Sequence, residues 1–111
     1  MPGISTAKVV TMFIYNITAQ VDNAIAKEWL QWQKEIHIPE VLATGYFYDH
    51  RLYKLLEQDE SVTQTYIVQF FALDLSDYEE YISTQAAALR EKSLRQWGNK
   101  VIAFRTILTS V

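Results

Sequence analysis

The sequence predicts a single α+β domain whose elements follow the order βαββαβ. Three observations lead to this prediction. The 111 residues fit one domain, and half of them are hydrophobic, which is enough for a core. Four segments rich in β-branched and aromatic residues are separated by two segments with helical periodicity. We expect one domain over residues 8–111, after a loose lead-in over residues 1–7 in which Pro2 and Gly3 break any pattern.

The first half of the chain reads as a strand followed by a helix. Residues 8–20 are rich in Val, Ile, Phe, Tyr and Thr, which favours a strand. Asp22 or Asn23 can cap the helix that follows. We expect Pro39 to interrupt this helix, and a short helical turn over residues 39–44 to end at Gly45. The apolar stripe of the helix is predicted at Ile25, Trp29, Trp32 and Ile36.

The second half supplies a hairpin, a long helix and a last strand. Strands are predicted over residues 46–56, 62–73 and 100–109. Ser76 and Glu79 have capping-box spacing, so a long helix is expected from there to Gly98. Two right-handed crossovers in this order give the ferredoxin-like plait, a four-stranded antiparallel sheet in the order 4-1-3-2 with both helices on one face.

Both faces of the three central strands carry apolar residues. Strand 8–20 has Phe13 and Ile17 on one face and Met12 and Ile14 on the other. An antiparallel sheet with one face in water alternates apolar and polar residues instead. The economical cover for the second face is another copy of the chain, so we expect a homodimer that closes a dimeric α/β barrel.

Composition excludes several classes of function. The chain has no cysteine, so disulfides and thiolate chemistry are absent. A net charge of −3 argues against a nucleic-acid partner, and we interpret the basic end of the long helix, from Arg90 to Lys100, as complementing the helix dipole rather than as a phosphate site. Three glycines supply no dinucleotide or phosphate loop, and two separated histidines do not predict a metal site. The apolar run 9–17 is too short for a membrane span. We expect a cytoplasmic protein without a cofactor.

Several short motifs resemble a known family. They are Tyr15-Asn16, Trp29-x-x-Trp32, the run His37-Ile-Pro-Glu-Val-Leu-Ala-Thr-Gly45, Tyr66-x-Val68-Gln69 and Ala103-Phe104-Arg105-Thr106. Over residues 9–111 the chain is similar to an uncharacterised bacterial family of short proteins described as a domain of unknown function, of which the His37–Gly45 run is the most specific part. That family looks like a branch of the dimeric α/β-barrel superfamily, which includes cofactor-free monooxygenases, mutarotases and stress-response barrels. The resemblance implies a dimer but transfers no reaction. The longer lead-in of this chain leaves its start codon open.

His37 is the best candidate for a catalytic group. It lies where the first helix ends, and the ordinary histidine pKa of about 6.5 suits proton transfer at neutral pH. The alternative is a structural histidine that stabilises the helix C-terminus or the Pro39 turn. Trp29 and Trp32 are interpreted mainly as core, although Trp32 and Tyr46 remain candidates for lining a pocket for an aromatic ligand.

Asn16, Gln69 and Arg105 each interrupt an apolar strand face. We expect the three side chains on one side of the sheet, away from the helices. They would form either a polar network that fixes the dimer register or a site for a small anionic ligand. Two classes of function stay open: a small-molecule-binding domain, which could be a cofactor-free enzyme, and a non-catalytic dimerisation or regulatory module. An enclosed cleft with His37 or Arg105 pointing into it would favour the first.

Overall fold

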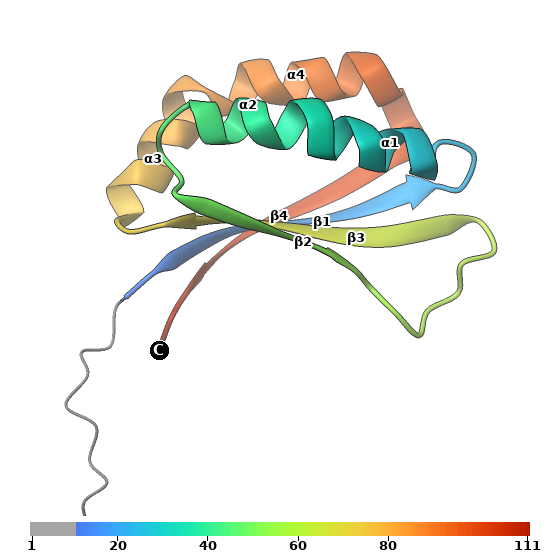
Figure 1. Ribbon diagram of the computed structural model, residues 1–111, viewed down its shortest axis with the longest axis horizontal. Coiled ribbons are helices and arrows are strands. Elements are labelled where there is room, and N and C mark those ends of the chain that lie inside the picture. Colours follow the sequence, from blue (N-terminus) through green and yellow to red (C-terminus); the bar gives the residue numbers. More distant parts are fainter. Residues whose placement is uncertain (1–10) are drawn as a thin grey trace, which may run out of the picture.

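A four-stranded antiparallel sheet carries the helices on one of its faces (Figure 1). The computed structural model describes residues 11–111, so the lead-in 1–7 and the predicted beginning of the first strand lie outside the described residues. The strands run in the spatial order β2-β3-β1-β4. Their bounds are β1 (Phe13–Asp22), β2 (Asp49–Lys54), β3 (Thr63–Ala72) and β4 (Val101–Thr109). The predicted α+β fold and its sheet order are confirmed.

The helical layer consists of two rods that lie side by side over the sheet (Figure 1). The first rod runs without a break through α1 (Ala26–Trp32), the π-helical turn η1 (Gln33–His37) and α2 (Ile38–Ala43). The second rod contains α3 (Leu75–Thr84) and α4 (Ala86–Trp97), followed by the short turn η2 (Gly98–Lys100). Between the layers lies a core of buried apolar side chains, of which the largest fully buried ones are Trp29, Phe70, Ile38, Val21 and Val41.

Pro39 does not interrupt the first helix, contrary to the sequence prediction. Ile38 keeps helical backbone angles, with φ −59° and ψ −47°. A proline in a helix removes one amide donor, and its ring clashes with the carbonyl group four residues earlier, which here belongs to Glu35. The chain widens instead: the Ile38 amide donates to the carbonyl oxygen of Gln33, five residues back. This π-helical turn accommodates the proline without ending the helix.

The π-helical turn also changes which side of the helix faces the sheet. Ile36, predicted on the apolar stripe, is 46% exposed, and the stripe continues instead through Gln33 and Ile38. A turn of α-helix holds fewer than four residues, so a residue four positions later lies slightly past its predecessor around the helix axis. A π turn holds more than four residues, so there the later residue lies slightly short of its predecessor. One π turn after an α turn therefore cancels the rotation. The wide turn therefore keeps one row facing the sheet, formed by Trp29, Gln33, His37 and Val41.

The second rod differs from the single long helix that was predicted. It is broken at Gln85, which has φ −120° and ψ −36°. It also begins at Leu75 after Asp74, without a capping hydrogen bond from a side chain, so the predicted capping box is wrong. The predicted apolar stripe is largely confirmed, because Ala86 and Leu89 are buried and Tyr78, Ile82 and Trp97 pack against the core.

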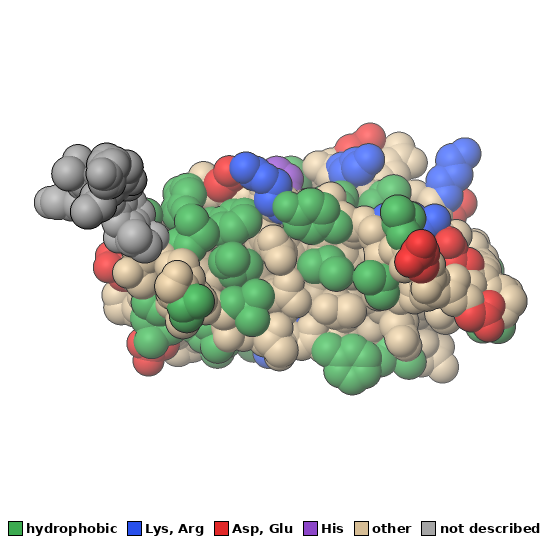
Figure 2. Space-filling model, turned by 90° about the horizontal axis from the view of Figure 1, so that it is seen from below, with side chains coloured by type: hydrophobic (Ala, Val, Ile, Leu, Met, Phe, Trp, Pro, Cys, Tyr) green, Lys and Arg blue, Asp and Glu red, His purple; other side chains and the backbone are tan. Residues whose placement is uncertain are grey.

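The face of the sheet opposite the helices carries exposed apolar side chains (Figure 2). Phe104 is 59% exposed and Ile102 is 54% exposed. Gln69 and Asn16 interrupt this face, and the Gln69 Nε2 atom donates to Asn16 Oδ1 at 3.2 Å. We call this surface the open sheet face: its apolar members are Ile14, Ile67, Phe71, Ile102, Phe104 and Leu108.

Trp29 should be a major structural residue, as the sequence suggested. Its side chain is 2% exposed and its ring lies 5.5 Å from the Tyr66 ring between centroids. Trp29→Ala should lower the free energy of unfolding by about 3–5 kcal/mol, the usual cost of removing a large aromatic ring from a core. Chemical denaturation measures this loss, with Leu94→Ala as a control at a side chain that is 65% exposed. A loss below about 1 kcal/mol for Trp29→Ala would show that the ring is not part of the core.

Candidate functional site

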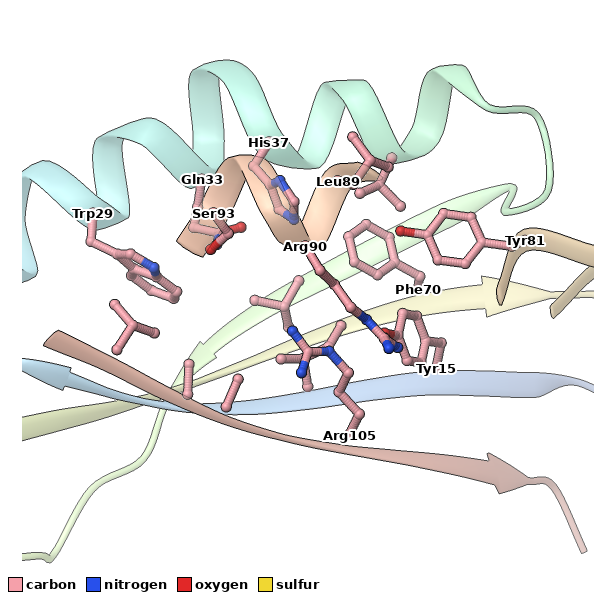
Figure 3. Close-up of a pocket in the computed structure, with 16 residues that line it drawn as sticks. Tyr15, Trp29, Gln33, His37, Phe70, Tyr81, Leu89, Arg90, Ser93 and Arg105 are labelled. Atoms are coloured by element: carbon pink, nitrogen blue, oxygen red, sulfur yellow. The ribbon is translucent and has the colours of Figure 1, made fainter. Parts of the chain in front are cut away.

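A cavity lies between the first helical rod and the sheet, on the side of strand β4 (Figure 3). Its volume is about 50 Å³. Trp29, Gln33 and His37 point into it from the helix, and Arg90 and Ser93 line it from α4. The remaining walls come from strands β1, β3 and β4 and from α3. The cavity is thus built by the row of helix positions that the π-helical turn keeps facing the sheet.

Two small residues leave the space for the cavity. Ala19 of β1 and Ala103 of β4 are paired directly across the sheet, and both line the cavity floor. On either side of this pair, the same two strands carry larger residues, with Val21 paired to Val101 and Ile17 paired to Arg105. Paired residues point to the same face of the sheet. The two alanine side chains therefore leave a gap in the cavity floor, and the larger side chains on either side border it.

Two arginine side chains reach the cavity from different elements. Arg105 comes from β4 and Arg90 from α4, and both guanidinium groups lie below His37 in Figure 3. An Nη2 atom of Arg90 donates to the phenol oxygen of Tyr15 at 2.8 Å, and Tyr15 is 3% exposed. Among the residues that the structure describes, those that line the cavity include no aspartate or glutamate. Neither arginine forms an ion pair with a residue that the structure describes.

The position of Arg105 corrects the sequence prediction. Ile17, the partner of Arg105 in the sheet, points toward the helices, so Arg105 lies on the face opposite Asn16 and Gln69. The polar group on the open sheet face is completed by Thr106 instead, which lies 3.4 Å from Asn16 Nδ2. The prediction failed by one residue of register, because β4 is apolar on both faces and its sequence does not indicate which face meets the core.

His37 is neutral in this environment at pH 7. Burial lowers its pKa from the ordinary 6.5 to about 4. The carboxylate of Glu40 opposes this shift, while the positive charges of Arg105 and Lys92 add to it. The imidazole ring stacks on Trp32 with 4.7 Å between centroids. A neutral imidazole offers one hydrogen-bond donor and one acceptor, and with this pKa it is a weak base at neutral pH.

The charges of both arginines influence the pKa of Tyr81, which also lines the cavity. Burial, together with the neighbouring phenol of Tyr15, raises the pKa of the Tyr81 phenol to about 12. The charges of Arg90 and Arg105 both lower that pKa, so both guanidinium groups are within electrostatic range of one phenol. The phenol therefore stays protonated at neutral pH. The cavity combines two cations with neutral hydrogen-bonding groups.

Among residues 11–111, two buried polar atoms of the cavity wall have no hydrogen-bond partner in the protein. They are Oε1 of Gln33, whose residue is 6% exposed, and Nε1 of Trp29. A third such atom, Nε1 of Trp97, belongs to a ring that packs edge-on against Trp32, 5.8 Å away between centroids, and does not line the cavity. Buried polar groups of native proteins are nearly always paired, so the first two atoms mark a place where a further polar group fits.

The other predicted site residues lie elsewhere. Trp32 contacts the cavity only through its stacking on His37, and Tyr46 packs against the core in the segment before β2. Neither residue lines the cavity. His37 and Arg105 are thus the two predicted residues that line the cavity, while Asn16 and Gln69 meet on the open sheet face. Within residues 11–111 there is no group of acidic and histidine side chains able to hold a metal ion, and no helix long and apolar enough to cross a membrane.

Sequence reasoning missed Arg90, Gln33 and Tyr15. Arg90 was assigned to the basic end of the helix, where its neighbours Lys92 and Arg95 do form ion pairs, with Glu40 and Glu91. Gln33 follows Trp29 by four positions, so the two residues share one helix face. A polar glutamine on the face that meets the sheet would have indicated a polar site there. The π-helical turn hid the signal, because an ideal helix places Trp32 and Ile36 on that stripe instead.

The low pKa of His37 can be measured directly. Because the folded chain holds this proton less tightly than the unfolded chain, unfolding takes up a proton between pH 6.5 and 4. Stability should therefore fall as the pH is lowered through that range, by on the order of 2–3 kcal/mol from this group. NMR titration should give a midpoint near 4 for His37. In His37→Gln, the stability lost between pH 6.5 and 4 should be smaller. A midpoint near 6.5 would show that the ring is open to water.

Solved structures with the same fold show low sequence identity. A dimeric ferredoxin-like protein from an uncultured marine organism matches with a TM-score of 0.63 and 9% identity, over 91% of this chain and 96% of that chain. A variant of SnoaB, a cofactor-independent oxygenase from Streptomyces nogalater, matches with a TM-score of 0.62 and 12% identity, over 88% and 92%. An ethyl tert-butyl ether d (EthD) family protein from Bacillus halodurans matches with a TM-score of 0.57 and 12% identity, over 88% and 97%. At these identities the likeness shows the fold alone.

The sequence itself also identifies a family. No curated protein matches the chain. A family model described as a domain of unknown function, DUF4286, matches residues 12–111. The expected membership of a family of unknown function is confirmed, while the His37–Gly45 run as its signature stays a prediction. With nearly its whole length matched, the chain belongs to the DUF4286 family.

Proposed function

We propose that this domain binds a small organic carboxylate in the cavity between the first helical rod and the sheet. The observation that carries the proposal is the pair of guanidinium groups of Arg90 and Arg105, which line a cavity that no acidic side chain from residues 11–111 lines. Both arginine residues are exposed, and their guanidinium groups converge on one cavity. Like charges that are brought together repel each other, and an anion between them relieves that repulsion. A guanidinium group matches a carboxylate well, because two parallel N–H donors meet its two oxygens.

The neighbours of Arg90 support binding rather than a structural role for the charge. The hydrogen bond from Arg90 to Tyr15 uses one of its five donors and holds the guanidinium group at the cavity. The other basic residues of α4, Lys92 and Arg95, are neutralised by carboxylates on the outer surface. Arg90 and Arg105 keep donors for a ligand. This arrangement fits the small-molecule-binding hypothesis better than the module hypothesis, which requires such groups to be paired internally.

His37 would contact the bound ligand as a neutral hydrogen-bonding group. Its pKa of about 4 makes it a weak proton acceptor at neutral pH, so we propose binding as the function and assign no reaction. A carboxylate bound beside Arg105 would raise the pKa of His37, because a negative charge favours the imidazolium form. The same group is thus a reporter of occupancy.

We further propose that the chain forms a homodimer through the open sheet face. Phe104 and Ile102 are more than half exposed on this face, and a second copy would cover it with the same apolar surface. The polar group Asn16, Gln69 and Thr106 lies within the same surface and would fix the register of the two sheets. The dimeric ferredoxin-like protein of the same fold supports this proposal.

Calorimetric titration with butyrate, at low salt and pH 7, tests the carboxylate site. Wild-type protein should bind, and Arg90→Met and Arg105→Met should each bind at least tenfold more weakly, because a charge-assisted hydrogen bond contributes about 1.5–3 kcal/mol. Arg95→Met is the matched control, since Arg95 lies on the same helix and pairs with Glu91 at the surface. Absence of binding by the wild type, or equal affinity in all variants, would refute the site.

Sedimentation at micromolar concentration tests the dimer. Wild-type protein should sediment at about twice the mass of the 12.9 kDa chain. Phe104→Glu places a charge on the open sheet face and should give monomers. Leu94→Glu adds the same charge on the outer surface of α4, at a residue that is 65% exposed against 59% for Phe104, and should leave the dimer intact. A monomeric wild type, or a dimer unaffected by Phe104→Glu, would overturn the assignment of this interface.

A further inference from the structure

The end of the cavity away from the arginines carries an unpaired acceptor and an unpaired donor, which come from successive turns of the first helical rod. Within the part of the chain that the structure describes, Oε1 of Gln33 accepts no hydrogen bond and Nε1 of Trp29 donates none, although the two residues are 6% and 2% exposed. They lie one helical turn apart on the row that faces the cavity (Figure 3). Leaving both atoms without partners in a buried site is costly, so the site favours a ligand that pairs them.

The chemistry of the missing partner follows from this pair. A hydroxyl group can donate its hydrogen to Gln33 Oε1 while its oxygen accepts from Trp29 Nε1. A carbonyl oxygen could serve only Trp29, and an ammonium group could serve only Gln33. A methyl group would leave both atoms unpaired. The hydroxyl group is therefore the smallest substituent that satisfies both atoms.

We infer that the ligand is a short hydroxycarboxylate, held by its carboxylate at Arg90 and Arg105 and by its hydroxyl group at Gln33 and Trp29. This inference rests on the proposed carboxylate site. In Figure 3 the two guanidinium groups lie below His37, apart from the side chains of Trp29 and Gln33. The hydroxyl group therefore lies several bonds from the carboxylate and not on the adjacent carbon.

The size of the cavity sets the length of the ligand. A volume of about 50 Å³ corresponds to roughly four water-sized positions. The carboxylate lies at the two exposed arginines, so the part of the cavity beneath the helix holds a chain of three or four non-hydrogen atoms. The alanine pair Ala19 and Ala103 forms the floor beneath that chain. A ligand of the size of 4-hydroxybutyrate fits both the span and the volume.

The test compares two probes that differ only at the far end. Pentanoate has a methyl group where 4-hydroxybutyrate has its hydroxyl group, so the two molecules have nearly the same size. Calorimetry on the wild-type protein should show at least tenfold tighter binding of 4-hydroxybutyrate, because a site built to pair a hydroxyl group discriminates against an analogue that lacks it. 2-Hydroxybutyrate carries the hydroxyl group beside the carboxylate and should bind no better than butyrate.

A variant of Gln33 locates the discrimination. Gln33→Leu keeps most of the volume and removes the acceptor, so it should bring the affinities for 4-hydroxybutyrate and pentanoate within about threefold of each other, while pentanoate binds no more weakly than before. Gln31→Leu changes a glutamine on the solvent side of the same helix and should keep the tenfold preference. Thermal melting of both variants checks that they fold. The comparison of probes on the wild type decides the question even if Gln33→Leu does not fold.

The possible failures separate the two proposals. Equal binding of 4-hydroxybutyrate and pentanoate by the wild type would mean that ordered water pairs Gln33 and Trp29, which overturns the hydroxyl inference and leaves the carboxylate site intact. A preference that survives in Gln33→Leu would also overturn the inference, because the hydroxyl group would then lie elsewhere. If the wild-type protein binds none of these carboxylates, both proposals are overturned.

Discussion

Pro39 has no amide hydrogen, and its ring cannot approach the carbonyl group of Glu35 as closely as an ordinary helical residue does. The first helical rod accommodates the proline by widening into the π-helical turn Gln33–His37. After this turn the Ile38 amide donates a hydrogen bond to the carbonyl oxygen of Gln33. Because the helix continues beyond the proline, Val41 still packs in the core. Because one turn is wider, Trp29, Gln33 and His37 all face the sheet. In a regular α-helix these positions would spiral away from the cavity.

The same row explains the mixed chemistry of the site. A helix row against a sheet normally carries apolar side chains, and here Trp29 and Val41 do so. Gln33 and His37 lie between them over the alanine pair of the sheet, where the missing bulk of Ala19 and Ala103 leaves room. The cavity and the polar groups that line it therefore have one structural origin. The two arginines then give this space a positive charge in a chain whose net charge is −3.

The fold could be predicted from the sequence because its signals are local. Strand composition and turn residues gave the order of the elements, and the right-handed crossover rule gave the sheet order. The register of β4 could not be predicted, since Ile102, Phe104 and Leu108 make the open sheet face as apolar as the core side. A shift of one residue in that interpretation placed Arg105 on the wrong face and separated it from His37.

The candidate site was only half predictable for a related reason. His37 stood out as one of two histidines, and Arg105 as a charge in an apolar strand. Gln33 and Arg90 did not stand out, because a glutamine on a helix and an arginine near a helix end are ordinary surface residues. Their roles depend on the π-helical turn and on the approach of α4 to Tyr15, which bring together residues 75 positions apart in the sequence.

A crystal structure of the protein grown with 4-hydroxybutyrate tests the central claim most directly. The account predicts the carboxylate within hydrogen-bond distance of the guanidinium groups of both Arg90 and Arg105, with the carbon chain over Ala19 and Ala103. Water alone in the cavity at a saturating ligand concentration, with the two guanidinium groups turned into solvent, would contradict it.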